Sequence, residues 1–535
     1  MVRWLGAIIL ALTLNAQEVS IQILTTTSLH GRILPQDSYT LQPKNQGWAR
    51  LATVIRSLKL ANRNTIAIDC GDTISGEPIN YVWSHLDRNL PEPSMVIMNS
   101  LKYNAMLVGG CELYYGTKQL RTIESQAKFP LLAANVISTS DNRMIFIPYT
   151  VVNVGGIRVA ILGLTVTRQP VQTKLEASEE IAFQDPIVVS KNLVPILRQK
   201  ELADMVVLAI HGESGSYIKS LENIIKDITA QVSDIDLVIA SHTNQKISSE
   251  INGVPILQAS SLGTTVGVGT FSFYKKPNGR WEPQLHQNKV ITIGPEVGLD
   301  SEVMSLTAAL RAKTETYLNT FAANLSVDLD SRWSRMESTA IMQLLHYVAK
   351  RASSADITSI AVPGAKIFIP KGPTSVRQFY SLYPNDYHIV KIRITGRQLR
   401  SYIEQSAHFY TFSHYPELFN KNFSPEDFDT LDGCNYSIDI SRPLGSRVID
   451  LTMHGQPVKD TQILTICIGS NRMSGTGGYL EAMGWSGKPE FINPVLFRNL
   501  VLEYVLSQPL LTINATNNWR IVPALDRERV LIQQP

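Results

Sequence analysis

Largely apolar runs with strand character alternate with stretches of helical periodicity over the first half of the chain. The apolar runs lie at 19–27, 65–72, 129–136, 157–165, 203–212 and 235–242. Between them, apolar residues recur at helical spacing in 48–61, 94–103 and 220–232. Short, continuously apolar strands are typical of a sheet that is covered on both faces. The pattern therefore predicts an α/β layered domain.

The pattern changes after residue 250. Residues 253–293 show the alternation and the Pro-Asn-Gly turn of antiparallel hairpins. Residues 300–324 have a polar, glycine-free amphipathic pattern that predicts a helix connecting two domains. A chain of 535 residues is too long for one core. We expect a signal peptide at 1–16, a first domain at 17–295, a linker helix at 296–324 and a second α/β domain at 325–535.

The first sixteen residues have the features of a secretory signal peptide. A basic start at Arg3 precedes an apolar stretch from Leu5 to Leu14, and Ala16 is a small residue suited to cleavage. A membrane anchor is the alternative, but this apolar run is too short to span a bilayer. No later segment approaches that length. We expect a secreted or periplasmic protein that has no membrane span and is a monomer.

Charge and cysteine content narrow the functional classes further. A net charge of +3 is small for this length and gives no reason to expect a nucleic-acid polymer as partner. Four cysteines are too few for a disulfide scaffold. Cys434 and Cys467 both lie in strand-like segments, and the sequence leaves open whether they pair.

Candidate metal ligands stand at the ends of the predicted strands. His30, Asp72, His211 and His242 each follow or end an apolar run. Parallel strands deliver their last side chains to one edge of a sheet, where ligands gather. A set of unrelated capping or core histidines is the alternative. Three histidines and one aspartate at equivalent ends favour a metal site.

Five short motifs resemble those of the secreted 5′-nucleotidase / 2′,3′-cyclic-nucleotide phosphodiesterase family, a branch of the calcineurin-like metallophosphoesterases. That family has Asp-x-His-Gly, Gly-Asp, Gly-Asn-His-Glu, a lone His and Gly-His-x-His in order. The chain has "TSLHG" (27–31), "CGDTISG" (70–76), "GGCELYYG" (109–116), "IHGES" (210–214) and "SHTN" (241–244). Its second half has "FIPKGPTSVRQFYSLYPND" (368–386) and "GCNYSIDISRPLGSRV" (433–448). The resemblance implies an N-terminal four-layer αββα sandwich, a linker helix and a C-terminal 5′-nucleotidase α/β domain.

The resemblance also implies a mechanism and the residues that serve it. Two metal ions bridged by one carboxylate would clamp a phosphoester and supply the attacking hydroxide. Asp72 matches the bridging carboxylate, His30 a ligand of the first metal, and His211 and His242 ligands of the second. Phe428 and Tyr479 match two rings that grip the base of a nucleotide or nucleoside. Ordinary packing is the alternative for both rings. Lys366 stands loosely at the place of a phosphate-binding Arg.

Five positions depart from the family pattern at the chemistry itself. Ser28 replaces an Asp of the first metal, Gly110 the Asn of the second, and Cys111 the catalytic His. Tyr114 replaces the Asp that partners that His, and Asn244 the last His of Gly-His-x-His. The site of the first metal loses more of its ligands than the site of the second. We therefore expect at most one divalent transition metal, such as zinc or manganese, held by Asp72, His211 and His242, and no dinuclear site.

The sequence is compatible with three functions. The favoured one is a nucleotide phosphoester hydrolase fold with impaired or absent catalysis that still binds nucleotides. The second is an active phosphohydrolase with one metal. The third is a thiosulfohydrolase-like enzyme, because the loop at 107–116 resembles that branch of the superfamily. Cys111 could act as a metal thiolate or nucleophile, but a lone thiol without a base in sequence is more often inert.

Overall fold

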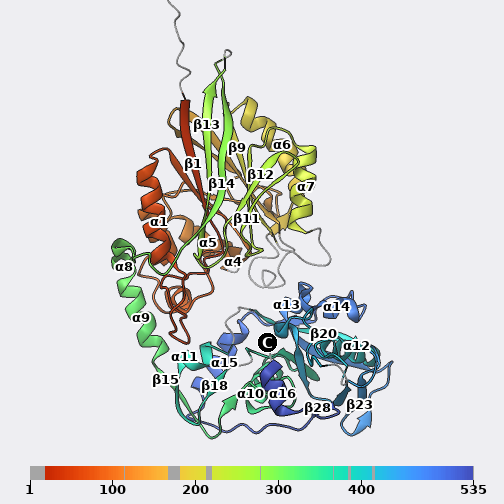
Figure 1. Ribbon diagram of the computed structural model, residues 1–535. Coiled ribbons are helices and arrows are strands. Elements are labelled where there is room, and N and C mark those ends of the chain that lie inside the picture. The colour runs from red at the N-terminus through yellow and green to blue at the C-terminus, as the bar shows by residue number, and fades with distance from the viewer. Residues whose placement is uncertain are drawn as a thin grey trace, which may run out of the picture.

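The protein is described here by a computed structural model that covers eight stretches of the chain. These are residues 18–113, 115–166, 181–212, 220–276, 279–364, 367–382, 387–412 and 416–533. The expected signal peptide and two candidate site residues, Tyr114 and Lys366, lie outside the described residues. Figure 1 shows two units, one above the other, with helix α9 (Ala308–Leu318) running along one side towards the lower unit.

The N-terminal unit contains two six-stranded sheets. The first has the order β14-β13-β1-β2-β3-β4 and the second the order β11-β12-β10-β9-β7-β6. The strands of the first sheet are β1 (Glu18–Thr26), β2 (Thr65–Asp69), β3 (Ala105–Leu107), β4 (Leu131–Leu132), β13 (Thr265–Lys275) and β14 (Trp281–Thr292). Those of the second are β6 (Tyr149–Val154), β7 (Ile157–Val166), β9 (Met205–Gly212), β10 (Leu237–Ser241), β11 (Ile247–Ile251) and β12 (Val254–Gln258). A small third sheet pairs β5 (Val136–Ser138) with β8 (Ile181–Phe183).

Alternate side chains of these strands enter two different cores. In β9, Val207 and Ala209 join the cluster between the two sheets, whereas Val206 and Leu208 join the cluster under the helices. A strand that is covered on both faces has no polar face, so its sequence is continuously apolar. The central core holds Ile21, Ile23, Ile66, Ile68, Leu107, Val159, Ile161, Leu237 and Ile239.

Helices cover the outer face of each sheet. The helices whose side chains pack with the first sheet are α1 (Trp48–Ala61), α3 (Pro93–Ser100), α5 (Gly116–Glu124) and α8 (Ser301–Leu306). Those on the second sheet are α6 (Pro186–Gln199) and α7 (Leu221–Gln231). The layers therefore follow the order α, β, β, α. The predicted α/β fold class is confirmed.

Between the two units, the structure corrects the expected single helix at 300–324. Helix α8 ends at Leu306, α9 begins after Thr307, and residues Phe321–Leu325 form the strand β15. The Asp300 side chain caps α8 by accepting a hydrogen bond from Val303 N. Phe321–Leu325 is a strand because it pairs with β19 (Gly372–Ser375) and β27 (Leu510–Leu511), a tertiary contact that local periodicity does not reveal.

The C-terminal unit has its own sheets around one large core. A five-stranded sheet has the order β21-β17-β25-β20-β26, and a four-stranded sheet the order β24-β23-β22-β28. Their strands are β17 (Ile357–Ala361), β20 (Ile389–Thr395), β21 (Asp429–Asp432), β22 (Asn435–Asp439), β23 (Val448–Met453), β24 (Gln456–Pro457), β25 (Ile463–Gly469), β26 (Phe491–Ile492) and β28 (Trp519–Val522). A short pair joins β16 (Leu329–Asp330) to β18 (Phe368–Ile369).

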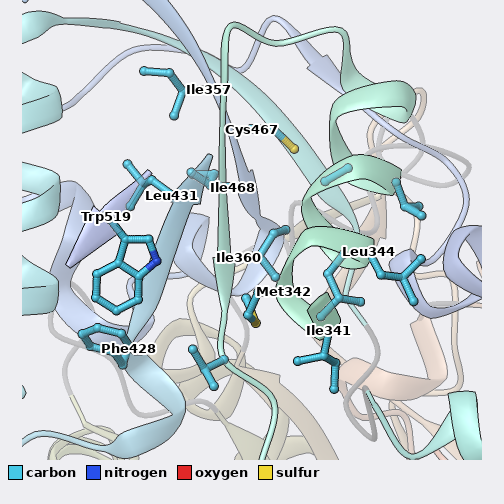
Figure 2. Packing of buried hydrophobic residues seen from close by; sticks show 14 of the residues in the cluster. Ile341, Met342, Leu344, Ile357, Ile360, Phe428, Leu431, Cys467, Ile468 and Trp519 are labelled. Atoms are coloured by element: carbon cyan, nitrogen blue, oxygen red, sulfur yellow. The ribbon is translucent and has the colours of Figure 1, made fainter. Parts of the chain in front are cut away.

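Helices of this unit pack on those sheets. They are α10 (Ala340–Ser353), α11 (Val376–Tyr380), α12 (Gly396–Ala407), α13 (Ser470–Met473), α14 (Tyr479–Ala482), α15 (Phe497–Leu506) and α16 (Arg527–Gln533). Figure 2 shows Met342 of α10 beside Ile360 in this core, and Ile468 beside Leu431. Cys434 and Cys467 are buried free thiols and form no disulfide. Within the described residues, no helix is long and apolar enough to cross a membrane.

Candidate metal centre

Three of the predicted ligands meet at the carboxyl ends of strands from both sheets. Asp72 follows β2, His211 lies near the end of β9, and His242 follows β10 directly. One ligand atom from each of these residues lies within 4.8 Å of the others. Asp72 Oδ2 is 3.2 Å from His211 Nε2 and 3.4 Å from His242 Nδ1. The parallel pairing of β9 with β10 delivers His211 and His242 to one sheet edge, as the sequence predicts, and Asp72 reaches the same place from β2 of the other sheet.

The hydrogen bonds of His211 prepare its ring for a metal. His211 Nδ1 lies 2.7 Å from the carbonyl oxygen of Cys70 and 2.7 Å from Ser241 Oγ. A carbonyl can only accept, so Nδ1 donates to it, and Nε2 is the ring nitrogen that faces Asp72 and would bind a metal once it loses its proton. This Nε2 is buried, and its polar neighbour is the Asp72 carboxylate at 3.2 Å. A buried ring nitrogen beside a carboxylate and a second imidazole fits a divalent transition metal.

The charges in the cluster depend strongly on one another. Burial alone would lower the pKa of His211, but the adjacent Asp72 carboxylate outweighs it and raises this pKa to about 9. Burial would raise the pKa of Asp72, yet His211 and His242 hold it well below its usual range. The carboxylate thus stays ionised and attracts a cation, which is the requirement for a metal ligand.

Glu112 is a residue at this site that our sequence analysis missed. Its buried carboxylate accepts hydrogen bonds from four backbone amides, those of Asp72 (2.7 Å), Thr73 (2.7 Å), Ile74 (3.2 Å) and Gly109 (2.8 Å). These bonds join the loop that carries Asp72 to the loop at 109–113. The sequence contained a signal for this residue. Glu112 matches the Glu of the Gly-Asn-His-Glu motif, whereas Gly110 and Cys111 replace its Asn and His.

A second buried carboxyl supports the same loop. Asp69 accepts from Thr26 Oγ1 (2.6 Å), from Thr73 Oγ1 (2.8 Å) and from the backbone N–H of Gly71 (3.0 Å). Burial raises the pKa of Asp69 to about 7 despite these bonds. Asp69 therefore links the end of β2 to β1. None of these contacts is to a metal ligand.

Backbone conformation marks the same positions independently. Ser28, His30, Asp72, His242 and Asn244 all have positive φ values, of 52°, 49°, 57°, 80° and 58°. Non-glycine residues rarely adopt this region, and such strain concentrates at functional sites. Five of the positions singled out from sequence therefore share an unusual conformation, although two of them no longer carry a typical ligand.

The residues expected around the first metal do not form a comparable cluster. His30 is near Asp72, and its Nδ1 lies 3.9 Å from Cys111 Sγ. Ser28 is buried, and its hydroxyl contacts Thr27 Oγ1 at 3.1 Å. Asn244 is exposed. Among the described residues, the only group whose ligand atoms converge is Asp72, His211 and His242.

Residues 110 and 111 give the loop at 109–113 little chemical reactivity. Gly110 begins the short helix α4 (Gly110–Leu113) and has no side chain to offer. Burial, with Asp72 and Glu112 nearby, raises the pKa of the Cys111 thiol well above its ordinary value. The thiol is therefore protonated at neutral pH, which is the state of an inert cysteine.

The two candidate base-stacking rings are not exposed, which corrects the expectation drawn from the resemblance. Phe428 is 1% exposed and packs against Phe409, Tyr410 and Trp519; Figure 2 shows it beside Trp519. Tyr479 is fully buried, with its ring 4.3 Å from that of Tyr402. Neither ring presents a face to a ligand in this arrangement.

The physical reason at Tyr479 is a buried ionic cluster. The Arg472 guanidinium lies 4.8 Å from the Tyr479 ring centroid and pairs with Asp429 at 2.6 Å and with Asp427 at 2.7 Å. Burying a charged Arg is favourable only because these carboxylates neutralise it. The Tyr479 hydroxyl also contacts Ser406 Oγ at 2.8 Å and donates to the Asp427 carbonyl at 2.5 Å. The ring is thus fixed by protein contacts.

Comparisons with known proteins agree with this architecture. Residues 316–484 match the family model "5′-nucleotidase, C-terminal domain". The chain is 25% identical over 95% of its length to the trifunctional nucleotide phosphoesterase protein YfkN of Bacillus subtilis, and the match spans 39% of that protein. It is 24% identical over 95% of its length to the 2′,3′-cyclic-nucleotide 2′-phosphodiesterase/3′-nucleotidase of Yersinia enterocolitica, covering 89% of that protein.

Solved structures show the same fold. A presumed 5′-nucleotidase from Staphylococcus aureus, in complex with alpha-ketoglutarate, matches 94% of this chain and 100% of that chain with a TM-score of 0.78 at 21% identity. The calcineurin-like phosphoesterase structure of YfkN matches 56% of this chain and 99% of that chain with a TM-score of 0.52.

Two packed sheets that carry a carboxylate and two imidazoles at their carboxyl edge define a calcineurin-like metallophosphoesterase fold. The C-terminal domain match at 316–484 and the two relatives make the chain similar in sequence to 5′-nucleotidases and 2′,3′-cyclic-nucleotide phosphodiesterases.

Proposed function

We propose that the protein is a mononuclear member of the 5′-nucleotidase / 2′,3′-cyclic-nucleotide phosphodiesterase family whose phosphoester hydrolysis is strongly impaired or absent. The observation that carries the proposal is the unequal state of the two expected metal positions. The ligand atoms of Asp72, His211 and His242 converge, and His211 turns Nε2 towards the other two residues. At the other position, Ser28 and the exposed Asn244 replace an anion and an imidazole. Neutral oxygens are weaker ligands for a transition metal.

Each residue then has a definite task. Asp72 and the two imidazoles hold one ion, and Cys70 O and Ser241 fix the His211 ring. Glu112 orients the Asp72 loop through backbone amides. A bound divalent ion would supply Lewis-acid stabilisation of a phosphoryl oxygen. No imidazole stands at position 111 to complete the machinery, because Cys111 is a partly buried thiol.

The expected size of the defect follows from the missing groups. A positioned acid/base contributes on the order of 10²–10⁴ in rate. Absence of a second ion removes one side of the clamp on the transferring phosphoryl group. Both losses together place any remaining hydrolysis far below that of an intact dinuclear site.

Nucleotides remain the proposed ligand class, and the division into domains supports it. We propose a metallophosphoesterase domain at 17–295, a connector at 296–324 and a nucleotide-binding domain at 325–535. The C-terminal domain match at 316–484 supports this division, since it falls almost wholly in the last of these. Because Phe428 and Tyr479 are held in the core, base recognition in this arrangement needs other residues.

Hydrolysis assays test the proposal. Purified protein with manganese, zinc or cobalt should hydrolyse AMP, 2′,3′-cyclic AMP and bis-p-nitrophenyl phosphate barely above background. A variant that combines Ser28→Asp, Gly110→Asn, Cys111→His, Tyr114→Asp and Asn244→His should gain activity, whereas single changes should gain little, because groups that act as a unit are non-additive. Turnover by the unmodified chain at ordinary enzyme rates of about 1–10³ s⁻¹ would refute the proposal.

A further inference from the structure

The two imidazoles of the metal centre are held in different ways. His211 lies within strand β9, is buried, and has its ring fixed by Cys70 O and Ser241. His242 instead begins the loop that follows β10, and its side chain is 34% exposed. A functional side chain on a loop is held less precisely than one on a strand, unless other contacts fix the loop. The position of His242 therefore depends on what holds residues 242–245.

The backbone of this loop is strained. His242 and Asn244 have φ values of 80° and 58°, in the left-handed region. Such conformations are costly and persist only where the surrounding contacts over-determine them. In the Gly-His-x-His motif that residues 241–244 resemble, a second His occupies the position of Asn244. Asn244 is exposed and is not one of the converging ligands, so the contacts that hold this part of the loop must come from the protein.

Gln258, the last residue of β12, supplies two of these contacts. Its Nε2 donates to Thr243 Oγ1 at 2.6 Å and to the carbonyl oxygen of Gln245 at 2.8 Å. A carbonyl only accepts, so the contact with Gln245 fixes which end of the Gln258 amide faces the loop. Strand β12 pairs in parallel with β10, and Gln258 therefore ends beside the loop that begins with His242.

The burial of Gln258 agrees with a positioning role. The side chain is fully buried, and its Oε1 has no hydrogen-bond partner among the described residues. A buried amide with an unmet acceptor is unfavourable for stability, so the two bonds to the loop explain its place better than packing does. Ser260 adds a third contact, because its hydroxyl donates to Asn244 O at 2.8 Å. Residues 243, 244 and 245 are thus each bonded to a side chain at or just after the end of β12.

We propose that Gln258 is a positioning residue of the metal centre, which holds the loop at 242–245 so that the His242 ring faces Asp72 before an ion binds. In this arrangement His242 Nδ1 lies 3.4 Å from Asp72 Oδ2. This role deepens the proposed function and rests on it, since it concerns the same single ion. A ligand group that is already in place loses little freedom on binding, so the ion binds more tightly.

Calorimetric titration of the metal-free full chain with zinc tests the proposal. Gln258→Met has a similar length but no amide donor, and it should weaken zinc binding about tenfold, the lower end of the effect of losing a group that orients a ligand. Thr243→Val removes the hydroxyl that accepts from Gln258 and leaves the buried residue in place, so it should weaken binding several-fold. Gln284→Met, at an exposed position of β14, is the matched control and should bind zinc as the unmodified chain does.

The absorption spectrum of the cobalt-loaded protein separates positioning from a structural role, because it reports the ligand geometry at the ion. This spectrum should change in Gln258→Met and stay the same in Gln284→Met. A lower thermal stability of metal-free Gln258→Met, with zinc affinity and cobalt spectrum unchanged, would make Gln258 a structural residue and overturn the proposal. If Gln258→Met does not fold, unchanged zinc affinity in Thr243→Val overturns it. Absence of zinc binding by the unmodified chain would instead refute the proposed function itself.

Discussion

Glu112 has a large effect on the site without being a predicted ligand, because its carboxylate holds the Asp72 loop through backbone amides alone. Burial raises its pKa, yet the four N–H donors define an acceptor-only environment. A neutral amide would turn one of its oxygens into an N–H donor that faces other donors. The arrangement of Asp72 therefore depends on a carboxylate at position 112.

Glu112→Gln should weaken metal binding by roughly 10–100-fold, the usual effect of losing a group that orients a ligand. Calorimetric titration of the metal-free protein with zinc measures this change in affinity. Glu222→Gln, at an exposed position of α7, is the control and should bind zinc as the unmodified chain does. Equal affinities in both variants would show that Glu112 does not position Asp72.

Gly109→Ala should abolish metal binding while leaving most of the fold intact. A Cβ at this position would lie 2.6 Å from Asp72 Oδ1 and 2.8 Å from His211 Cε1, too close for either to stay in place. Gly298→Ala is the matched control, because nothing lies within 4 Å of its added Cβ. Metal content and thermal unfolding of the two variants are compared. Full metal binding in Gly109→Ala would contradict the observed packing.

The candidate metal ligands could be identified from the sequence, whereas the burial of the candidate base-stacking rings could not. His211 and His242 could be found because strand ends of a parallel sheet share an edge. The burial of Tyr479 could not be found, since it depends on Tyr402, Arg472 and Asp429, which are distant in sequence and meet only in the folded core. A motif match fixes where a residue lies along the chain and leaves open what covers it.

At the scale of elements, helix α3 begins with a buried acid that makes stability depend on pH. Glu92 Oε2 accepts from Met95 N at 2.7 Å, and its Oε1 is buried without a partner. Burial raises the pKa of Glu92 to about 8 from an ordinary value of 4.5. The folded state therefore holds this proton more tightly than the unfolded state does. Stability contributed by Glu92 is full below pH 4.5 and falls as the pH rises towards 8.

Glu92→Gln should remove that dependence, because Gln stays neutral and keeps an acceptor for Met95 N–H. The unmodified chain should lose up to ~1.4 kcal/mol of unfolding free energy for each pH unit between about 5 and 8 through this group. Urea unfolding of both proteins at several pH values gives the difference. A difference that does not grow with pH would show that Glu92 is already ionised in the folded protein.

The elements that sequence analysis missed have local signals that contradict their structure. Residues 186–199 form α6 although Pro195 lies inside it, and no helix was predicted there. Residues 321–325 continue a helical pattern but form β15, because β19 and β27 provide strand partners. In both cases tertiary packing outweighs weak local preference.

Contacts between the two units determine how the whole molecule is arranged. Arg377 of α11 donates to Ser38 O at 2.6 Å and to Glu315 Oε2 at 2.5 Å, and Tyr39 stacks on Tyr380. Tyr81 lies against Tyr317 at 5.7 Å. These residues join the loop at 37–46 and helices α2 (Pro78–Tyr81) and α9 to the C-terminal unit.

Arg377→Met should lower the unfolding free energy by about 1–2 kcal/mol, because it removes hydrogen bonds to a buried cation. Arg393→Met is the control, since its pair with Glu490 is exposed and should contribute less than about 1 kcal/mol. Differential scanning calorimetry of both variants measures the change. An equal effect of the two substitutions would show that the Arg377 contacts do not hold the units together.

The most direct measurement is the metal content of purified chain after loading with excess zinc or manganese and removal of free ions. Elemental analysis should find one ion per chain, and His211→Ala should reduce it to none, because Asp72, His211 and His242 are the ligands that converge. Two tightly bound ions per chain, or one ion retained in His211→Ala, would contradict this account of the site.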